Sequence, residues 1–165
     1  MSDEEYTVNS LHIGAGIVGL IVAGIFYIGI PLFFNKYFIP NFDEIIHNPE
    51  ISVVWTNIIP LFDRWLLIGI PMTFLGALTW ACPKGSRHRF TMSSVYLIAY
   101  IAWLLYVLNF GDLTGLVDIT YQGGTIAFGM TLSFILYLIV LFKALKLLVI
   151  YGTYKDERRN YLNGE

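Results

Sequence analysis

The chain has 165 residues, of which 56% are hydrophobic and 13% charged, and its formal net charge is −2. A soluble domain carries about 25% charged residues, so this chain has too few charges to cover a water-soluble surface. The absence of a basic excess also argues against a nucleic-acid partner, and the single cysteine, Cys82, excludes an internal disulfide framework and a CxxC metal or redox motif.

Four long apolar runs follow one another along the chain, at residues 11–34, 58–82, 92–110 and 125–150. An α-helix needs about 20 residues to cross a bilayer, and each run approaches or exceeds this length. None shows the alternation of apolar and polar residues that is typical of a membrane β-strand. We therefore predict an all-α integral membrane protein, a bundle of four transmembrane helices in a single domain, residues 1–165. The helices are expected at about 9–35, 58–82, 91–110 and 123–153.

The segment before the first run is acidic, with Asp3, Glu4 and Glu5 and no Lys or Arg. A cleavable signal peptide needs a basic segment before its apolar stretch. We therefore expect the first run to be a transmembrane helix that is not cleaved.

Small residues recur at four-residue intervals in the first two helices. Such a stripe allows helices to approach closely in lipid. It defines a candidate helix-packing interface, either inside this chain's own bundle or against a helix of a partner. Its members are Ala15, Gly19 and Ala23 in the first helix and Thr73, Ala77 and Ala81 in the second.

The outer loop between the first two helices, residues 35–57, is partly apolar and contains aromatic side chains such as Trp55. Such a segment lies in the lipid headgroup region or packs against another subunit. Asp43, His47 and Glu50 follow one another at spacings of four and three, so a helix would place them on one face. Carboxylate and imidazole suit divalent metals, which makes these three residues candidate metal ligands. The alternative is a solvated helix face, and Pro49 weakens the helical reading.

In the third helix, Tyr96, Tyr100 and Trp103 recur at spacings of four and three and form one aromatic stripe. A buried Tyr hydroxyl needs a hydrogen-bond partner. The stripe either makes hydrogen bonds within the chain or contacts a partner subunit or lipid, as Trp55 is also expected to do.

Basic residues predict the orientation, because cytoplasmic loops of membrane proteins carry an excess of Lys and Arg. The two ends and the 83–91 loop are therefore expected in the cytoplasm of a multi-pass cell-membrane protein. Lys143 and Lys146 fall in the last turns of the predicted fourth helix, from which their side chains would extend to the cytoplasmic interface. The other basic residues on this side are Lys84, Arg87, Arg89, Lys155, Arg158 and Arg159, against Lys36 and Arg64 on the outer side.

With these boundaries, the central parts of the four helices lack ionisable residues, and no pair of the histidines His12, His47 and His88 lies at one depth to ligate a haem. No hydrolase, metalloprotease, P-loop or dinucleotide motif is present. We therefore expect no catalytic residue and no cofactor of the chain's own, with lipids bound at its surface.

These features favour a non-catalytic integral membrane subunit of a larger multi-subunit complex, of the energy-converting, respiratory or membrane-bound oxidoreductase kind. Its partners would be other integral membrane subunits and the lipid bilayer, with no nucleic acid. The alternative is a small homo-oligomeric transporter or channel, with a pore lined by Asn109, Thr125, Thr131 and Ser133. A third class is a membrane enzyme that uses Asp43, His47 and Glu50 at the outer face.

Overall fold

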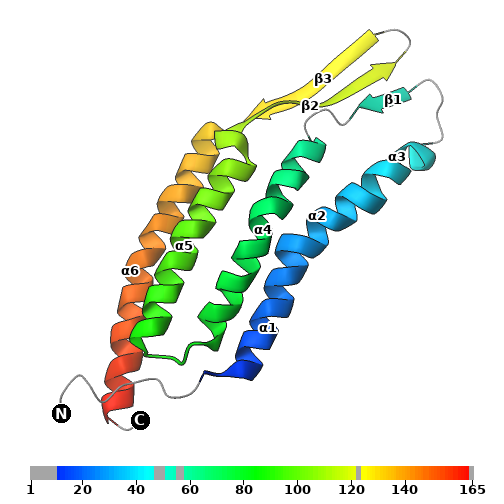
Figure 1. Cartoon of the computed structure of the whole chain (residues 1–165). Helices are drawn as coiled ribbons and strands as arrows, with labels where there is room; N and C mark the ends of the chain where they lie inside the picture. Colours follow the sequence, from blue (N-terminus) through cyan, green and yellow to red (C-terminus); the bar gives the residue numbers. More distant parts are fainter. Residues whose placement is uncertain (1–10, 47–50, 55–57, 122–123, 164–165) are drawn as a thin grey trace.

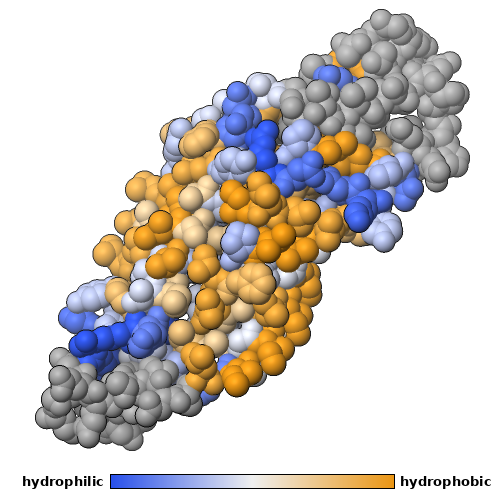
Figure 2. All heavy atoms as spheres, in the orientation of Figure 1, coloured by the Kyte–Doolittle hydropathy of each residue, from blue (hydrophilic) through white to orange (hydrophobic). Residues whose placement is uncertain are grey.

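The computed structural model describes residues 11–46, 51–54, 58–121 and 124–163 (Figure 1). It is mostly helical, and four of its helices are long and apolar enough to cross a membrane, as predicted. Figure 2 shows a broad apolar zone over the middle of the molecule, with polar residues gathered toward both ends. These features indicate a multi-pass helical membrane protein.

The first span is longer than the predicted helix 9–35, because the helix continues to Ile46 through two π-helical turns. Its segments are α1 (Ile13–Gly24), η1 (Ile25–Gly29), α2 (Ile30–Phe33), η2 (Phe34–Phe38) and α3 (Ile39–Ile46). The turn η1 lies directly before Pro31, where a regular α-helix would lose a hydrogen bond and clash with the proline ring. The polar residues Asn35 and Lys36, which suggested the end of the helix, lie inside η2.

The second and third spans are close to the prediction. They are α4 (Ile58–Ala81) and α5 (Arg87–Val107). Helix α5 begins four residues before the predicted position 91, because Ser86 caps it: the Ser86 Oγ accepts a hydrogen bond from the Arg89 N–H at 3.0 Å. The short 3₁₀ turn η3 (Asn109–Gly111) follows α5.

The structure contains an antiparallel three-stranded sheet that the sequence did not predict. Its strands are β1 (Ile51–Val54), β2 (Asp112–Tyr121) and β3 (Gly124–Thr131), in the order β1-β2-β3. Because β3 pairs with β2 over its whole length, the fourth helix, α6 (Ser133–Asn163), begins ten residues later than the predicted 123–153. The predicted start of this helix is therefore wrong.

The four spans form a row in chain order: α1 packs on α4, α4 on α5, and α5 on α6 (Figure 1). Helices α1 and α6 are the two edges, so the arrangement is an open row of helices and not a closed bundle. The buried core lies where η1, α4 and α5 meet, around Tyr27, Met72, Trp103 and Val107.

Helices α1 and α4 approach closely through small residues. A Cβ on Gly19 would lie 2.8 Å from the Cβ of Trp80, and a Cβ on Gly16 would lie 3.0 Å from the Cβ of Ala81. At Gly69, a Cβ would collide with the backbone oxygen of Tyr27. Glycine at these positions therefore allows α4 to approach α1 and η1 this closely.

The start of α1, the loop between α4 and α5, and the end of α6 lie together at one end of the molecule (Figure 1), which we call the basic end. The His12 N–H donates to the Ala81 carbonyl at 2.9 Å, and the Gly85 N–H donates to the Glu157 Oε2 at 2.8 Å. The sheet lies at the opposite end, which we call the sheet end.

Candidate functional site

Two lysines of α6, Lys143 and Lys146, lie inside the helix and away from both of its ends. Lys143 is ten residues from the start of α6, about 15 Å along its axis. Its Nζ lies 4.8 Å from the ring centre of Tyr100, which is itself inside α5 and not near its basic end. Lys146 follows one turn further on. The expectation that both lysines sit in the last turns of the helix is wrong, because α6 continues to Asn163, ten residues beyond its predicted end.

Both lysines line a hollow between α4, α5 and α6, which we call the lysine groove; its volume is about 390 Å³. The groove brings the two ammonium groups of α6 together with hydroxyl groups of two helices, α4 and α5. Lys143 is half-buried against Tyr100, whereas Lys146 is exposed. The lining residues are Thr79, Ser93, Tyr96, Leu97, Tyr100, Lys143, Lys146 and Ile150.

A second hollow of about 270 Å³ adjoins the lysine groove, and we call it the tyrosine hollow. Tyr96 and Tyr100 line both, so the two hollows form one continuous face. The hydroxyl oxygens of Tyr27 and Tyr96 lie 2.9 Å apart and share a hydrogen bond. Tyr27 is only 2% exposed, so this bond supplies the partner that a buried phenol needs. The remaining lining residues are Gly19, Val22, Ala23, Phe26, Gly76 and Trp80.

An aromatic core supports this face from behind. Trp103 is 3% exposed and contacts Tyr27 edge to face, with ring centres 5.2 Å apart. Its ring also meets Trp65, at 5.5 Å. Trp103 is therefore a core residue and not a contact for lipid or a partner, which corrects the prediction for this residue. Tyr96 and Tyr100, the other members of the stripe, line the two hollows.

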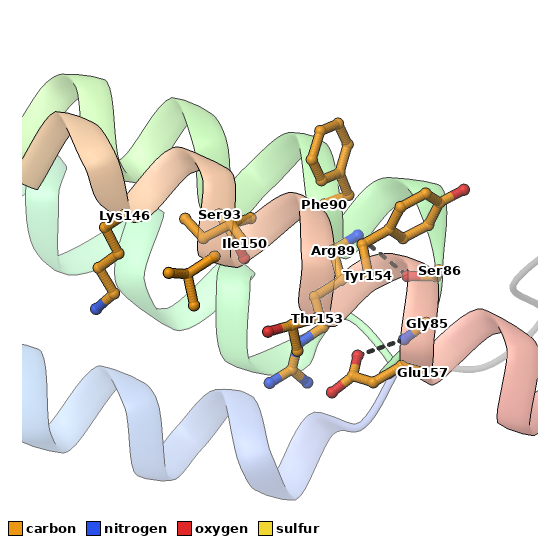
Figure 3. Close-up of a pocket in the computed structure, with 11 residues that line it drawn as sticks. Gly85, Ser86, Arg89, Phe90, Ser93, Lys146, Ile150, Thr153, Tyr154 and Glu157 are labelled. Carbon is orange, nitrogen blue, oxygen red and sulfur yellow. Dashed lines mark hydrogen bonds between the residues drawn. The ribbon is translucent and has the colours of Figure 1, made fainter.

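A third hollow of about 200 Å³ lies at the basic end, between the start of α5 and the last turns of α6 (Figure 3). Its hydrogen bonds tie the loop before α5 to the rest of the chain: the Gly85 N–H donates to Glu157, and the Arg89 Nη1 donates to the Cys82 carbonyl at 3.1 Å. Burial raises the pKa of the Cys82 thiol, and the nearby Arg89 charge opposes this only in part. The thiol is thus protonated and inert at neutral pH.

The structure places five of the six small residues of the predicted packing stripe between or beside α1 and α4. A Cβ on Gly76 would lie 3.3 Å from the Cβ of Ala23, and one on Gly24 would lie 3.9 Å from the Cγ2 of Thr73. Ala15 is half-buried, and its neighbour Gly16 makes the close approach to Ala77 and Ala81. Gly16 was expected as a further point of close approach in the first helix, whereas Gly69 and Gly76 of α4 were not predicted.

The outer-loop candidates fall largely outside the described residues. Asp43 belongs to α3, whereas His47, Glu50 and Trp55 lie outside the part of the chain that the structure describes. Within the described residues, no three His, Cys, Asp or Glu side chains gather as a metal site. The metal hypothesis for Asp43, His47 and Glu50 therefore stays a prediction.

The lysine groove is the strongest candidate site, because it concentrates positive charge and hydrogen-bond donors within an apolar surface. Ammonium groups and phenol hydroxyls bind carboxylates and other anions by charge-assisted hydrogen bonds. No family model, no curated protein and no solved structure matches this chain.

The hydrogen bond between Tyr27 and Tyr96 can be tested by substitution. Tyr96→Phe leaves the buried Tyr27 hydroxyl without its partner, and we expect it to lower the free energy of unfolding by about 1–2 kcal/mol. The double variant Tyr27→Phe/Tyr96→Phe removes both hydroxyls and is expected to be less destabilised than the sum of the two single variants. SDS titration of the detergent-solubilised protein measures these differences. Strict additivity of the two substitutions would show that the bond does not form.

Proposed function

We propose that this chain is a non-catalytic integral membrane subunit of a larger membrane complex, crossing the bilayer four times. One observation carries the proposal. Lys143 lies halfway along the apolar length of α6, and no carboxylate among the described residues pairs with it or with Lys146. The groove that these lysines line is open on one side of the row of helices.

A charged side chain in the middle of a lipid bilayer has a free-energy cost. A lysine at the centre of a spanning helix costs about 2.5–3.5 kcal/mol on insertion scales. The contact of the Lys143 ammonium with the Tyr100 ring offsets about 0.5–2 kcal/mol of this. A neighbouring protein that brings a negative charge into the groove would offset the remaining cost. The chain would therefore be more stable in an assembly than alone in lipid.

The outer surface of α6 supports the same proposal. Its large apolar side chains are exposed on several sides, and among the described elements its main packing partner is α5. Phe134, Leu141 and Leu148 are among the most exposed apolar residues of the chain. A helix that is apolar on nearly all sides is covered by lipid or by other membrane helices.

The alternative, a homo-oligomeric channel, loses the polar lining that was expected for it. Thr125 and Thr131 belong to β3, and Asn109 belongs to η3. Ser133 is the first residue of α6, where its hydroxyl donates to the Phe110 carbonyl at 3.2 Å. All four residues thus gather at the sheet end instead of along a path through the row of helices.

We further propose that the basic end faces the cytoplasm and that the sheet end lies outside. The proposal is supported by the distribution of Lys and Arg along the molecule, which follows the positive-inside rule. The sheet end carries the carboxylates of Asp63 and Asp112. The Asn35 Nδ2 donates a hydrogen bond to Asp63 at 2.8 Å, and the Thr114 hydroxyl donates one to Asp112. The basic residues of the other end are Lys84, Arg87, Arg89, Lys155, Arg158 and Arg159.

Labelling of introduced cysteines in intact cells tests the orientation. The native thiol of Cys82 is buried, and a Cys82→Ala background removes it from the experiment. We expect thiols at positions 2 and 163 to resist a membrane-impermeant reagent until the cells are opened, because both ends face the cytoplasm. A thiol at position 48 should react at once. Reaction of either terminal thiol in sealed cells would overturn the orientation.

Purification from native membranes in a mild detergent tests the subunit proposal. We expect the tagged chain to elute with at least one different integral membrane protein at a fixed ratio, because the lysine groove needs a neighbour. A control chain with Leu141→Phe, altered on the exposed side of α6, should retain the same partners. Recovery of the chain alone, or only with further copies of itself, would contradict the proposal.

A further inference from the structure

We propose that the joined lysine groove and tyrosine hollow form the seat of a transmembrane helix from another subunit, and that this helix carries an Asp or Glu at mid-membrane depth, paired with Lys143. The inference rests on the proposed function and names the chemistry of the partner. It follows from three features of the face: its shape, the distribution of its charge, and its depth.

The shape of the face suits a helix. Because Tyr96 and Tyr100 line both hollows, the face is continuous from Val22 of α1 across α4 and α5 to Lys146 of α6. The edges of the row, α1 and α6, border it, and α4 and α5 form its floor. Figure 3 shows the Lys146 side chain leaving α6 clear of the helix, on the same side as the Arg89 guanidinium.

The two sides of the face differ in chemistry. On the α1 and α4 side, the apolar side chains of Val22, Phe26 and Trp80 are exposed. On the α6 side, the ammonium groups of Lys143 and Lys146 stand beside the phenols of α5, without a carboxylate among the described residues. An occupant that matches both sides is apolar along one flank and acidic at one point of the other.

The depth of Lys143 decides the source of the acid. The headgroup of an anionic lipid, or the carboxylate of a fatty acid, lies at the membrane interface, about 15 Å from the centre of the hydrocarbon layer. Lys143 lies near that centre, where the only abundant carboxylates are side chains of other spanning helices. Since Lys143 is half-buried on the Tyr100 ring and Lys146 is exposed, Lys143 is the better ordered partner for the acid.

The opposite side of α6 provides a matched control. Leu141, Leu145 and Leu148 lie across the helix from Lys143, and all three are exposed. These three side chains carry no charge, so this side of α6 is not expected to bind an acidic partner helix.

Photo-crosslinking in native membranes tests the seat. A benzophenone amino acid replaces Trp80 on the face, or Leu141 on the opposite side of α6 as the control. We expect the Trp80 position to form an adduct with a different polypeptide, whose crosslinked segment is apolar and contains an Asp or Glu. The Leu141 position should label lipid. Lipid adducts alone at position 80, a second copy of this chain, or an apolar segment without an acid would each overturn the proposal.

The charge at Lys143 is tested in the purified complex. We expect Lys143→Gln to reduce the amount of partner recovered per chain by about tenfold or more, because it leaves the partner's acid unpaired in lipid. Lys143→Arg keeps the charge and should retain the partner, as should Leu141→Gln, a polar substitution at the same depth on the opposite side. Full recovery of the partner with Lys143→Gln would refute this inference while leaving the subunit proposal intact. Absence of any distinct partner from the wild-type preparation would instead refute the proposed function.

Discussion

A short joint between η3 and the start of α6 fixes the position of the last helix along its own axis, and with it the depth of the two lysines. The Leu132 N–H donates to the Gly111 carbonyl at 2.7 Å, and the Ser133 hydroxyl donates to the Phe110 carbonyl. Gly111 has a φ of +88°, and a Cβ there would lie 2.5 Å from the Cα of Ser133. Only glycine fits such a position. The joint therefore sets the axial register of α6 against α5.

The register decides where the lysines lie. With the helix starting at Ser133, Lys143 reaches the ring of Tyr100, and one end of the same helix brings Tyr154 to Phe90, with ring centres 5.1 Å apart. A start ten residues earlier would have moved both lysines toward the basic end, where their cost in lipid is small. The register set at Gly111 therefore places Lys143 beside the Tyr100 ring.

The sequence was sufficient to predict the four spans, because apolar runs of this length match the thickness of a bilayer and exceed most core helices of soluble domains. It was not sufficient to separate β3 from α6. The run from Gly124 to Ile150 is predominantly apolar, with Lys143 and Lys146 as its charged residues, and hydropathy does not distinguish a strand from a helix inside one continuous run. The pairing that defines β3 is with β2, and β2 also pairs with β1, which is distant in the sequence. Such non-local pairing leaves little trace in a local pattern.

The first span illustrates a different limit. Asn35 and Lys36 are polar and suggest the end of a helix, yet they lie in η2, and the π turns carry the helix on to Ile46. The Asn35 side chain donates to Asp63 of α4, a partner that only the tertiary structure reveals.

The candidate site could be predicted only in part. The spacing of Tyr96, Tyr100 and Trp103 correctly places them along one side of α5, but spacing alone does not tell which neighbours meet that side. The structure divides the stripe: Trp103 enters the core with Tyr27, while the two tyrosines line the open face. Lys143 and Lys146 were not predicted as site residues, because the fourth helix was expected to begin ten residues too early.

The row of helices, its open face and the central charge are consistent with one another. In a row of four helices, both edges and one face are not covered by other helices of the row. The two lysines make that face suited to an acidic group. The polar tyrosine pair and the aromatic core behind it hold the floor of the face in place. Under the proposed function, the charged face is the part of the chain that would select a partner.

Measuring the depth of α6 in a bilayer shows directly whether Lys143 lies near the middle of the membrane. Nitroxide labels at the exposed positions Leu138 and Ala144, in a Cys82→Ala background, report depth through their relative accessibility to oxygen and to a polar nickel chelate. If α6 enters the bilayer near Ser133, the label at position 144 lies closest to the bilayer centre and the label at 138 lies nearer the sheet-end interface. A deeper label at 138 than at 144 would place the lysines near the interface at the basic end and would contradict a mid-membrane charge.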